Sequence, residues 1–290
     1  MEVSTKRKPK RDELHQKELK LREILGEMGN ICVALSGGAD SAFLLAEAAR
    51  VNKMKVLAVT VTSVSYAEHE KRDATKIVNL LGVPQRSIEL DQMSLPEFVA
   101  NQPDRCYYCK KATFSAIKTI AAQEGFTNVA DGGNMDDLKD YRPGLKALEE
   151  LGIRSPMQEA KLTKADIRAL SREIGLFTAS KPSYACLASR IPYGESITPE
   201  KLARIEAAET YLSEQGFEGI RVRSHGNLAR IEVTPEQITL LTQERTRTRI
   251  VDRFQELGYR YVTVDLQGFR SGSMNETLPE KTVASGGSSV

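Results

Sequence analysis

The sequence has no long apolar run and only four cysteines in 290 residues. No stretch approaches the ~18 consecutive apolar residues that a membrane-spanning helix needs, and the basic N-terminus is not followed by the apolar segment of a secretory signal. The cysteines are too few and too unevenly spaced for the disulfide framework of a secreted protein. We therefore expect a cytoplasmic protein without membrane association, in which the thiols are reduced, bind a metal or take part in catalysis.

The charges also show no strong excess of one sign. A net charge of +2 gives no whole-protein electrostatic footprint for nucleic acid, although a local basic patch is still open. With 40% hydrophobic and 28% charged residues, the composition is that of a globular protein with a full core. The length favours about two domains, and we find no internal repeats.

Short β-branched runs alternate with helical segments from Ile31 to about Ser155. The strand-like runs are ICVAL, KVLAVTV, RSIEL, NVAD and IRS, and a further helix with Thr163 as its N-cap and Asp166 three residues on follows them. This alternation is typical of right-handed βαβ units whose parallel sheet is covered on both faces. The sequence therefore predicts an α/β domain with a doubly wound parallel sheet.

A second domain is expected beyond an irregular segment that contains Pro182, Pro192 and Gly194. The order after it is a helix, two alternating strands, two helical stretches and a strand, which predicts a small α+β domain with an antiparallel sheet. The predicted limits are a charged segment with a short surface helix at 1–28, the α/β domain at 29–184, the α+β domain at 185–278 and a disordered tail at 279–290.

The stretch LSGGADS (35–41) lies between the first predicted strand and the helix that follows it. Its glycines permit a close backbone approach, and the helix N-terminus presents free N–H groups to an anion. The stretch is neither GxxxxGKS, since it has no lysine, nor GxGxxG. Ser36 and Ser41 can donate hydroxyl hydrogen bonds, and Asp40 can orient the loop or hold Mg²⁺. The alternative is an ordinary turn capped by Ser36 or Asp40.

SGGADS resembles the SGGxDS loop of the PP-loop ATP pyrophosphatases, which cleave ATP to AMP and pyrophosphate while they adenylate a substrate. The resemblance implies that ATP and Mg²⁺ are cofactors. It assigns the pyrophosphate portion of ATP to Ser36, Gly37, Gly38, Asp40 and Ser41.

Further stretches resemble the LarE-type sulfur transferases over nearly the whole chain, from about Gly29 to Leu278. They are DGGNMDDLKDYRPGLKA (131–147), ACLASRIPYGESIT (185–198), GIRVRSHGNLARIEV (219–233) and GYRYVTVDLQGFRSGSMNETL (258–278). These enzymes convert pyridinium-3,5-biscarboxylic acid mononucleotide to its thiocarboxylate form, on the way to the nickel-pincer nucleotide cofactor. Adenylation suits that reaction, because a carboxylate is a poor acceptor for sulfide until AMP replaces oxide as the leaving group.

The same resemblance implies three further groups of site residues. It assigns ATP to Asp131 and Gly132, and it assigns the substrate phosphate to Ser189, Arg190, Arg221 and Arg223, whose hydroxyl and guanidinium groups suit an anion. A solvated strand face is the alternative for Arg221 and Arg223. Glu206, Glu209 and Glu232 are expected to serve a divalent metal in the second domain, although exposed carboxylates are common on helices and strands.

The cysteines bear on the source of the sulfur. Cys106 and Cys109 form a CxxC pair ahead of a helix, and Cys186 lies in SYACLASR. A closed zinc site needs four ligands, but Cys32 lies inside the first strand and the histidines lack suitable spacing. Three cysteines without a fourth protein ligand suit a 4Fe-4S cluster with one open iron, where sulfide can bind, and the multi-cysteine branch of the family resembles this arrangement. Two alternatives stay open: a disulfide or persulfide relay, and single-turnover donation of the Cys186 sulfur.

The nearest rival function is tRNA thiolation, which shares the phosphate loop and the CxxC-plus-cysteine pattern. A nucleotide-binding sensor without catalysis is a second rival. Because a tRNA enzyme needs a broad basic surface, we expect a small-molecule nucleotide substrate rather than nucleic acid. A sulfide or sulfur donor and a homo-oligomeric state complete the expected partners.

Overall fold

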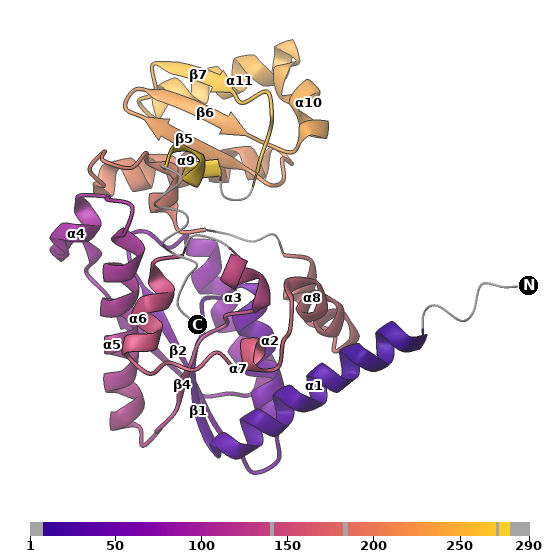
Figure 1. Cartoon of the computed structure of the whole chain (residues 1–290). Helices are drawn as coiled ribbons and strands as arrows, with labels where there is room; N and C mark the ends of the chain where they lie inside the picture. Colours follow the sequence, from indigo (N-terminus) through magenta and orange to yellow (C-terminus); the bar gives the residue numbers. More distant parts are fainter. Residues whose placement is uncertain (1–7, 140–141, 182–184, 271–272, 279–290) are drawn as a thin grey trace, which may run out of the picture.

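The computed structural model describes residues 8–139, 142–181, 185–270 and 273–278. The predicted disordered tail at 279–290 lies outside these residues. Within them, no helix combines the length and the apolar character required to cross a membrane. Figure 1 shows an α/β domain and a smaller domain joined by a short irregular junction.

The first sheet is parallel and has the strand order β3-β2-β1-β4. Its strands are β1 (Asn30–Ala34), β2 (Lys55–Thr62), β3 (Gln85–Glu89) and β4 (Val129–Ala130). Side chains alternate across the sheet, so Ile31 and Val33 pack into one core while Cys32 packs into another on the opposite face. Burial on both faces explains why the ICV run is uninterrupted by polar residues. The predicted doubly wound α/β fold is confirmed.

Helices cover both faces of this sheet (Figure 1). One face carries α1 (Lys8–Met28), α2 (Ala39–Arg50), α3 (Glu68–Leu81), α7 (Pro156–Glu159) and α8 (Lys164–Glu173), and the other carries α5 (Arg105–Gln123) and α6 (Gly144–Glu150). The predicted cap of α8 is present, because Thr163 Oγ1 accepts from the Asp166 N–H and the Asp166 carboxylate accepts from the Thr163 N–H.

The first helix differs from the short surface helix that was expected. It covers Lys8–Met28, and it buries Leu21, Leu25 and Met28 in the same core as α2 and α8. These residues repeat at helical spacing, so they form an apolar stripe even though the segment is highly charged. The helix is therefore part of the α/β core.

The smaller domain contains α9 (Pro199–Glu214), β5 (Arg221–His225), β6 (Leu228–Glu232), α10 (Ile238–Thr242), α11 (Glu244–Glu256) and β7 (Tyr261–Val264). Its sheet has the order β5-β6-β7, in which β5 pairs with β6 antiparallel but β6 pairs with β7 parallel. The expectation of an antiparallel sheet is therefore wrong for β7. The two intervening helices carry the chain back to the start of the sheet, which permits parallel pairing.

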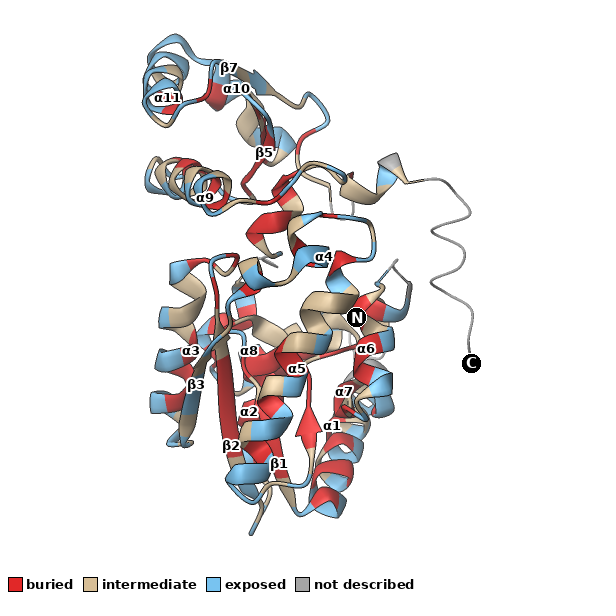
Figure 2. Cartoon of the chain, turned by 90° about the vertical axis from the view of Figure 1, so that its left-hand side faces the viewer, coloured by how far each residue is buried: buried red, intermediate tan, exposed pale blue. Residues whose placement is uncertain are grey.

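The junction between the domains has its own apolar core. It joins Phe98 of α4 (Pro96–Val99) to Leu187 and Ala188 of the 3₁₀ turn η4 (Leu187–Arg190) and to Leu202 and Ile205 of α9. The buried Asn101 side chain donates to the backbone carbonyls of Ile191, Pro192 and Glu195. Figure 2 shows buried residues in the junction as well as in the sheet. The junction is thus a packed structure that can hold site residues from both domains.

Candidate functional site

The phosphate loop (LSGGADS, residues 35–41) connects β1 to α2 and includes the first residues of that helix. The N-cap of α2 is Gly38, so no side chain caps the N–H groups of its first turn. The Ser36 N–H donates to Ser41 Oγ at 3.3 Å, the two hydroxyl oxygens lie 3.1 Å apart, and the Gly38 N–H donates to Ser36 Oγ at 3.3 Å. The serines therefore shape the loop, and the helix N-terminus behind it can receive an anion.

Two glycines allow close contacts around this loop. Gly37 has φ +80°, and a Cβ there would lie 2.3 Å from the Glu70 carbonyl oxygen. A Cβ on Gly132 would lie 2.9 Å from the Ser41 nitrogen, so the Asp131–Gly132 segment packs directly on the start of α2. Both positions exclude larger residues for steric reasons.

The acids near the loop are held by polar partners. Asp40 accepts from Asn134 Nδ2 at 3.2 Å, and burial raises the pKa of the Asp40 carboxyl. Asp131 accepts from Ser155 Oγ at 2.6 Å and lies 3.7 Å from Lys110 Nζ. The structure thus brings the predicted ATP residues from the loop and from the segment after β4 into one region.

Lys181 is a cation at this loop that sequence reasoning missed. Its Nζ donates to the Gly37 carbonyl oxygen at 2.9 Å and lies 2.7 Å from Asp73 Oδ2 of α3. The loop motif contains no lysine, and Lys181 lies 144 residues beyond Gly37. No local pattern links the two segments, so only the tertiary fold reveals the contact.

Glu70, in the first turn of α3, is a second residue that the sequence did not single out. Burial raises the pKa of the Glu70 carboxyl to about 7, against the lowering effect of the charges on Lys181, Arg190 and Arg221. Glu70 therefore lies within electrostatic reach of both the phosphate loop and the arginines of the junction.

The Glu70→Gln variant tests this burial through the pH dependence of stability. The folded-state pKa of about 7 exceeds the ordinary value of 4.5, so the folded protein keeps a proton that the unfolded chain releases between these pH values. Stability contributed by the neutral carboxyl is therefore lost as pH rises from about 4.5 to about 7. Urea unfolding should show no gain for Glu70→Gln at pH 4 and a gain of about 1–3 kcal/mol at pH 8.

The exposed Glu68, in the same turn, supplies the control for this measurement. Glu68→Gln should show no comparable change between the two pH values. A difference between Glu70→Gln and wild type that stayed constant with pH would contradict the burial argument.

The three cysteines assigned to catalysis come from two segments. Cys106 and Cys109 are one turn apart at the start of α5, and Cys186 directly precedes η4. Burial, and then the charges of Cys186 and Cys106, raise the pKa of the Cys109 thiol to about 12. Cys106 is exposed as a residue, yet the atoms packed around its sulfur raise its pKa, and the charge of Cys186 raises it further. The three sulfurs are therefore electrostatic neighbours.

The surroundings of these thiols are mixed. Cys109 and Cys186 pack against the apolar core of the junction, and the buried Gln92 donates from Nε2 to Cys109 Sγ at 3.0 Å. Among the residues that the structure describes, no group of three or more His, Cys, Asp or Glu side chains is arranged to hold a metal ion. Cys32 is fully buried in the sheet core, as expected from its place in the first strand.

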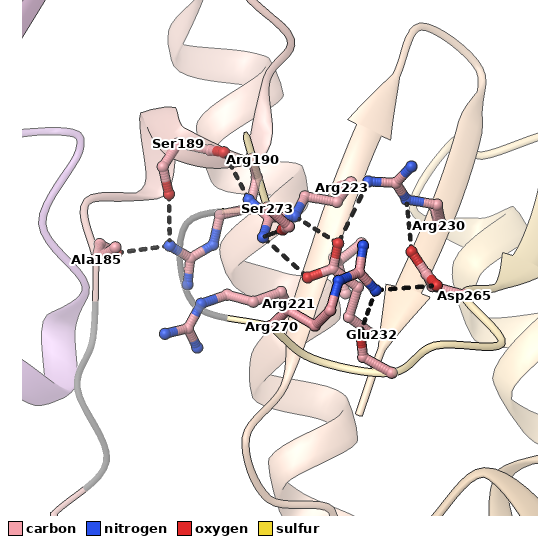
Figure 3. A network of polar contacts seen from close by, with 12 residues as sticks. Ala185, Ser189, Arg190, Arg221, Arg223, Arg230, Glu232, Asp265, Arg270 and Ser273 are labelled. Carbon is pink, nitrogen blue, oxygen red and sulfur yellow. Dashed lines mark hydrogen bonds and ion pairs between the residues drawn. The ribbon is translucent and has the colours of Figure 1, made fainter. Parts of the chain in front are cut away.

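The predicted substrate arginines lie in a polar network at the junction (Figure 3). Arg190, which is 1% exposed, pairs with Glu209 at 2.8 Å and donates to the Ser189 hydroxyl and to the Ala185 carbonyl. Arg223 binds both carboxylate oxygens of Glu232, at 2.9 and 2.8 Å, and donates to the Ser189 carbonyl at 2.9 Å. The guanidinium group of Arg223 therefore joins β5 to η4, and that of Arg190 joins η4 to α9.

The structure does not support the divalent-metal prediction for Glu206, Glu209 and Glu232. Glu209 accepts from Arg190 and from the Val222 N–H, Glu232 is buried against Arg223, and Glu206 accepts from the Glu68 N–H. Because each carboxylate is neutralised or bonded by a different protein partner, the three do not present oxygens to one cation.

A parallel sheet whose first strand leads through an SGGxDS loop into an uncapped helix N-terminus defines the class of PP-loop ATP pyrophosphatases. In agreement, the family model described as NAD synthase matches residues 14–107. The pyridinium-3,5-bisthiocarboxylic acid mononucleotide synthase of Lactiplantibacillus plantarum is 40% identical over 274 residues, which cover 93% of this chain and 98% of that protein.

Two other proteins are similar to this chain. An uncharacterized protein of Synechocystis sp. is 40% identical over 265 residues, 91% of this chain and 99% of its own length. A tRNA-cytidine(32) 2-sulfurtransferase of Anaeromyxobacter sp. is 28% identical over 121 residues, 40% of each chain. From its full-length similarity to the Lactiplantibacillus synthase, the chain belongs to the LarE-type family of sulfur transferases, which are enzymes of the PP-loop class.

Proposed function

We propose that this enzyme uses ATP to adenylate a carboxylate of pyridinium-3,5-biscarboxylic acid mononucleotide and converts it to a thiocarboxylate. The observation that carries the proposal is the 40% identity with the Lactiplantibacillus synthase over almost the full length of both chains. The electrostatics of the site support it. Burial raises the pKa of Glu70, and the charges of Lys181 at the loop and of Arg190 and Arg221 at the junction lower it.

In the proposed reaction, each part of the site has a separate task. Ser36, Gly37, Gly38 and Ser41 would bind the pyrophosphate portion of ATP, and Asp40 would hold Mg²⁺. Asp131 and Gly132, which pack on the start of α2, would contact ATP from the β4 side. A substrate carboxylate attacks the α-phosphorus, pyrophosphate leaves, and the acyl-adenylate then loses AMP when sulfur attacks its carbonyl carbon. Ser189, Arg190, Arg221 and Arg223 form the wall that binds the substrate phosphate, and their carboxylate partners orient the guanidinium groups.

Cys106, Cys109 and Cys186 are proposed to hold a 4Fe-4S cluster. Thiolates are the ligands that such a cluster requires. After burial, the charge of Cys186 contributes to the raised pKa of both Cys106 and Cys109, which supports a shared site. The donor from Gln92 to Cys109 Sγ suits a thiolate ligand. When bound, the cluster would supply a sulfide at the iron without a protein ligand. The persulfide relay and the sacrificial use of Cys186 remain the alternatives.

Metal analysis separates these possibilities. After anaerobic reconstitution, wild type is expected to contain about four iron and four acid-labile sulfide atoms per chain, and Cys109→Ala is expected to lose most of both. Cys32→Ala is the matched control, because Cys32 is a core thiol on another element, and it should retain the wild-type content. Equal iron in wild type and Cys109→Ala would contradict the cluster. Loss of the elements of H₂S from Cys186 after one reaction would establish sacrificial donation instead.

The whole function is tested by pyrophosphate release. Wild type with ATP, Mg²⁺, sulfide and the pyridinium mononucleotide should release pyrophosphate and AMP, and the product should gain one sulfur for one oxygen. Release that required tRNA and fell steeply with salt would support the tRNA alternative, which rests on the partial similarity to the Anaeromyxobacter enzyme. ATP binding without any release would support the sensor alternative. A homo-oligomeric state and a cytoplasmic location are also proposed. The proposed domain boundary lies at residues 184/185, and the α/β domain includes α1, because that helix packs into its core.

A further inference from the structure

Lys181 connects the segment before the junction to the main chain of the phosphate loop. Its side chain is 11% exposed and lies between two oxygens, the Gly37 carbonyl at 2.9 Å and Asp73 Oδ2 at 2.7 Å. Gly37 is also the loop residue whose backbone packs on the first turn of α3, where Glu70 lies. The ammonium group is therefore at the loop itself, on the side that faces α3.

The backbone holds Lys181 from both directions. Its N–H donates to the Thr178 carbonyl at 3.0 Å, and its own carbonyl accepts from Arg168 Nη2 of α8 at 2.8 Å. The start of the side chain is thus fixed, while the flexible four-carbon stem lets the ammonium group exchange one oxygen ligand for another.

Other cations act on the loop in a different way. The charges of Lys164 and Arg142 lower the pKa of Asp40, but both side chains are paired with the buried Asp137, at 3.2 and 3.0 Å. Lys181 instead contacts the loop backbone, and it also pairs with the Asp73 carboxylate. An incoming polyphosphate would bring more negative charge than Asp73 supplies.

We infer that Lys181 is a phosphate-binding residue, which transfers from Asp73 and the Gly37 carbonyl to the β- and γ-phosphates of ATP and stays with pyrophosphate as it leaves. This inference rests on the proposed use of ATP. The SGGADS loop has no lysine, and Lys181 would supply the missing positive charge from a later part of the chain. The competing explanation is that Lys181 is a structural clamp between the loop and α3.

Calorimetric binding of three ligands separates the two explanations: Mg-ATP, Mg-pyrophosphate and AMP, at one ionic strength. Because Lys181→Met removes a charge-assisted hydrogen bond, it should lower the affinities for ATP and pyrophosphate by about tenfold to a hundredfold and leave the AMP affinity unchanged. Lys181→Arg should recover part of the pyrophosphate affinity. Lys17→Met removes another partly buried lysine, which lies on α1 and pairs with Asp166 of α8 at 2.9 Å, and it should change none of the three affinities.

The Asp73→Asn variant makes the test independent of how well Lys181→Met folds. It removes the competing carboxylate, so the inference predicts ATP and pyrophosphate affinities equal to or above wild type. If Lys181 is a structural clamp, Asp73→Asn and Lys181→Met should both lower the affinities for all three ligands and the melting temperature. That result would overturn the inference. If a folded Lys181→Met protein kept wild-type pyrophosphate affinity, the inference about Lys181 would be refuted and the proposed function would be unaffected. If the wild-type protein bound neither ATP nor pyrophosphate, both the inference and the proposed function would be refuted.

Discussion

The Gly37→Ala variant should lose ATP binding and the pyrophosphate-releasing activity. Gly37 has φ +80°, and its added Cβ would lie 2.3 Å from the Glu70 carbonyl, which is backbone and cannot rotate away. The loop must therefore move off α3, and the N–H groups that receive the phosphate move with it. We expect at least a hundredfold loss of ATP affinity, on the order of 3 kcal/mol, in calorimetric titration with Mg-ATP.

Gly82 provides a matched control for the conformational part of this effect. It has φ +64° at the C-terminal end of α3, and a Cβ there would meet nothing within 4 Å. Gly82→Ala should cost about 1–2 kcal/mol of folding stability and leave ATP affinity unchanged. If Gly37→Ala behaved like Gly82→Ala, the close contact between the loop and α3 would be disproved.

The second large effect is expected from Arg223→Met. This change leaves Glu232, which is 1% exposed, without its two hydrogen bonds from Arg223, and it removes the donor to the Ser189 carbonyl. Breaking a buried ion pair from one side typically costs about 3–5 kcal/mol. Urea unfolding should therefore show a loss of this size, together with a loss of binding of the pyridinium mononucleotide.

Arg230 contacts the same glutamate and serves as the control. Its side chain is 39% exposed and reaches Glu232 Oε1 at 3.3 Å. Arg230→Met should cost less than about 1 kcal/mol, because solvent screens the pair and Arg223 still neutralises Glu232. If the two substitutions lowered the free energy of unfolding equally, burial would not explain the contribution of these ion pairs to stability.

The α/β architecture could be predicted from the sequence because local patterns determine it. The β-branched runs, the helical spacing between them and the Thr163–Asp166 cap each need only a few neighbouring residues. The burial of α1 was missed because its apolar stripe is diluted by charged residues. The parallel pairing of β7 was missed because strand direction depends on how the two preceding helices pack.

Only the part of the site that is continuous in sequence could be predicted. The phosphate loop is continuous in sequence, so its role could be inferred before its geometry was known. Lys181 and Glu70 could not be found, since their contacts join segments that are distant in the chain. The carboxylates Glu209 and Glu232 were assigned to a metal because a sequence shows their charge but not the arginines that neutralise it. The grouping of Cys186 with the CxxC pair was inferred from the sequence and the family resemblance, and a shared cluster stays a prediction.

The glycine cap of α2 has a consequence for folding as well as for binding. Since Gly38 offers no side chain to the first-turn N–H groups, α2 begins without the stabilisation that a serine or aspartate cap supplies. A phosphate of the proposed ATP would take the place of that cap. Nucleotide binding and completion of the helix are then one thermodynamic event, and the folded chain becomes more stable as the nucleotide concentration rises above its dissociation constant.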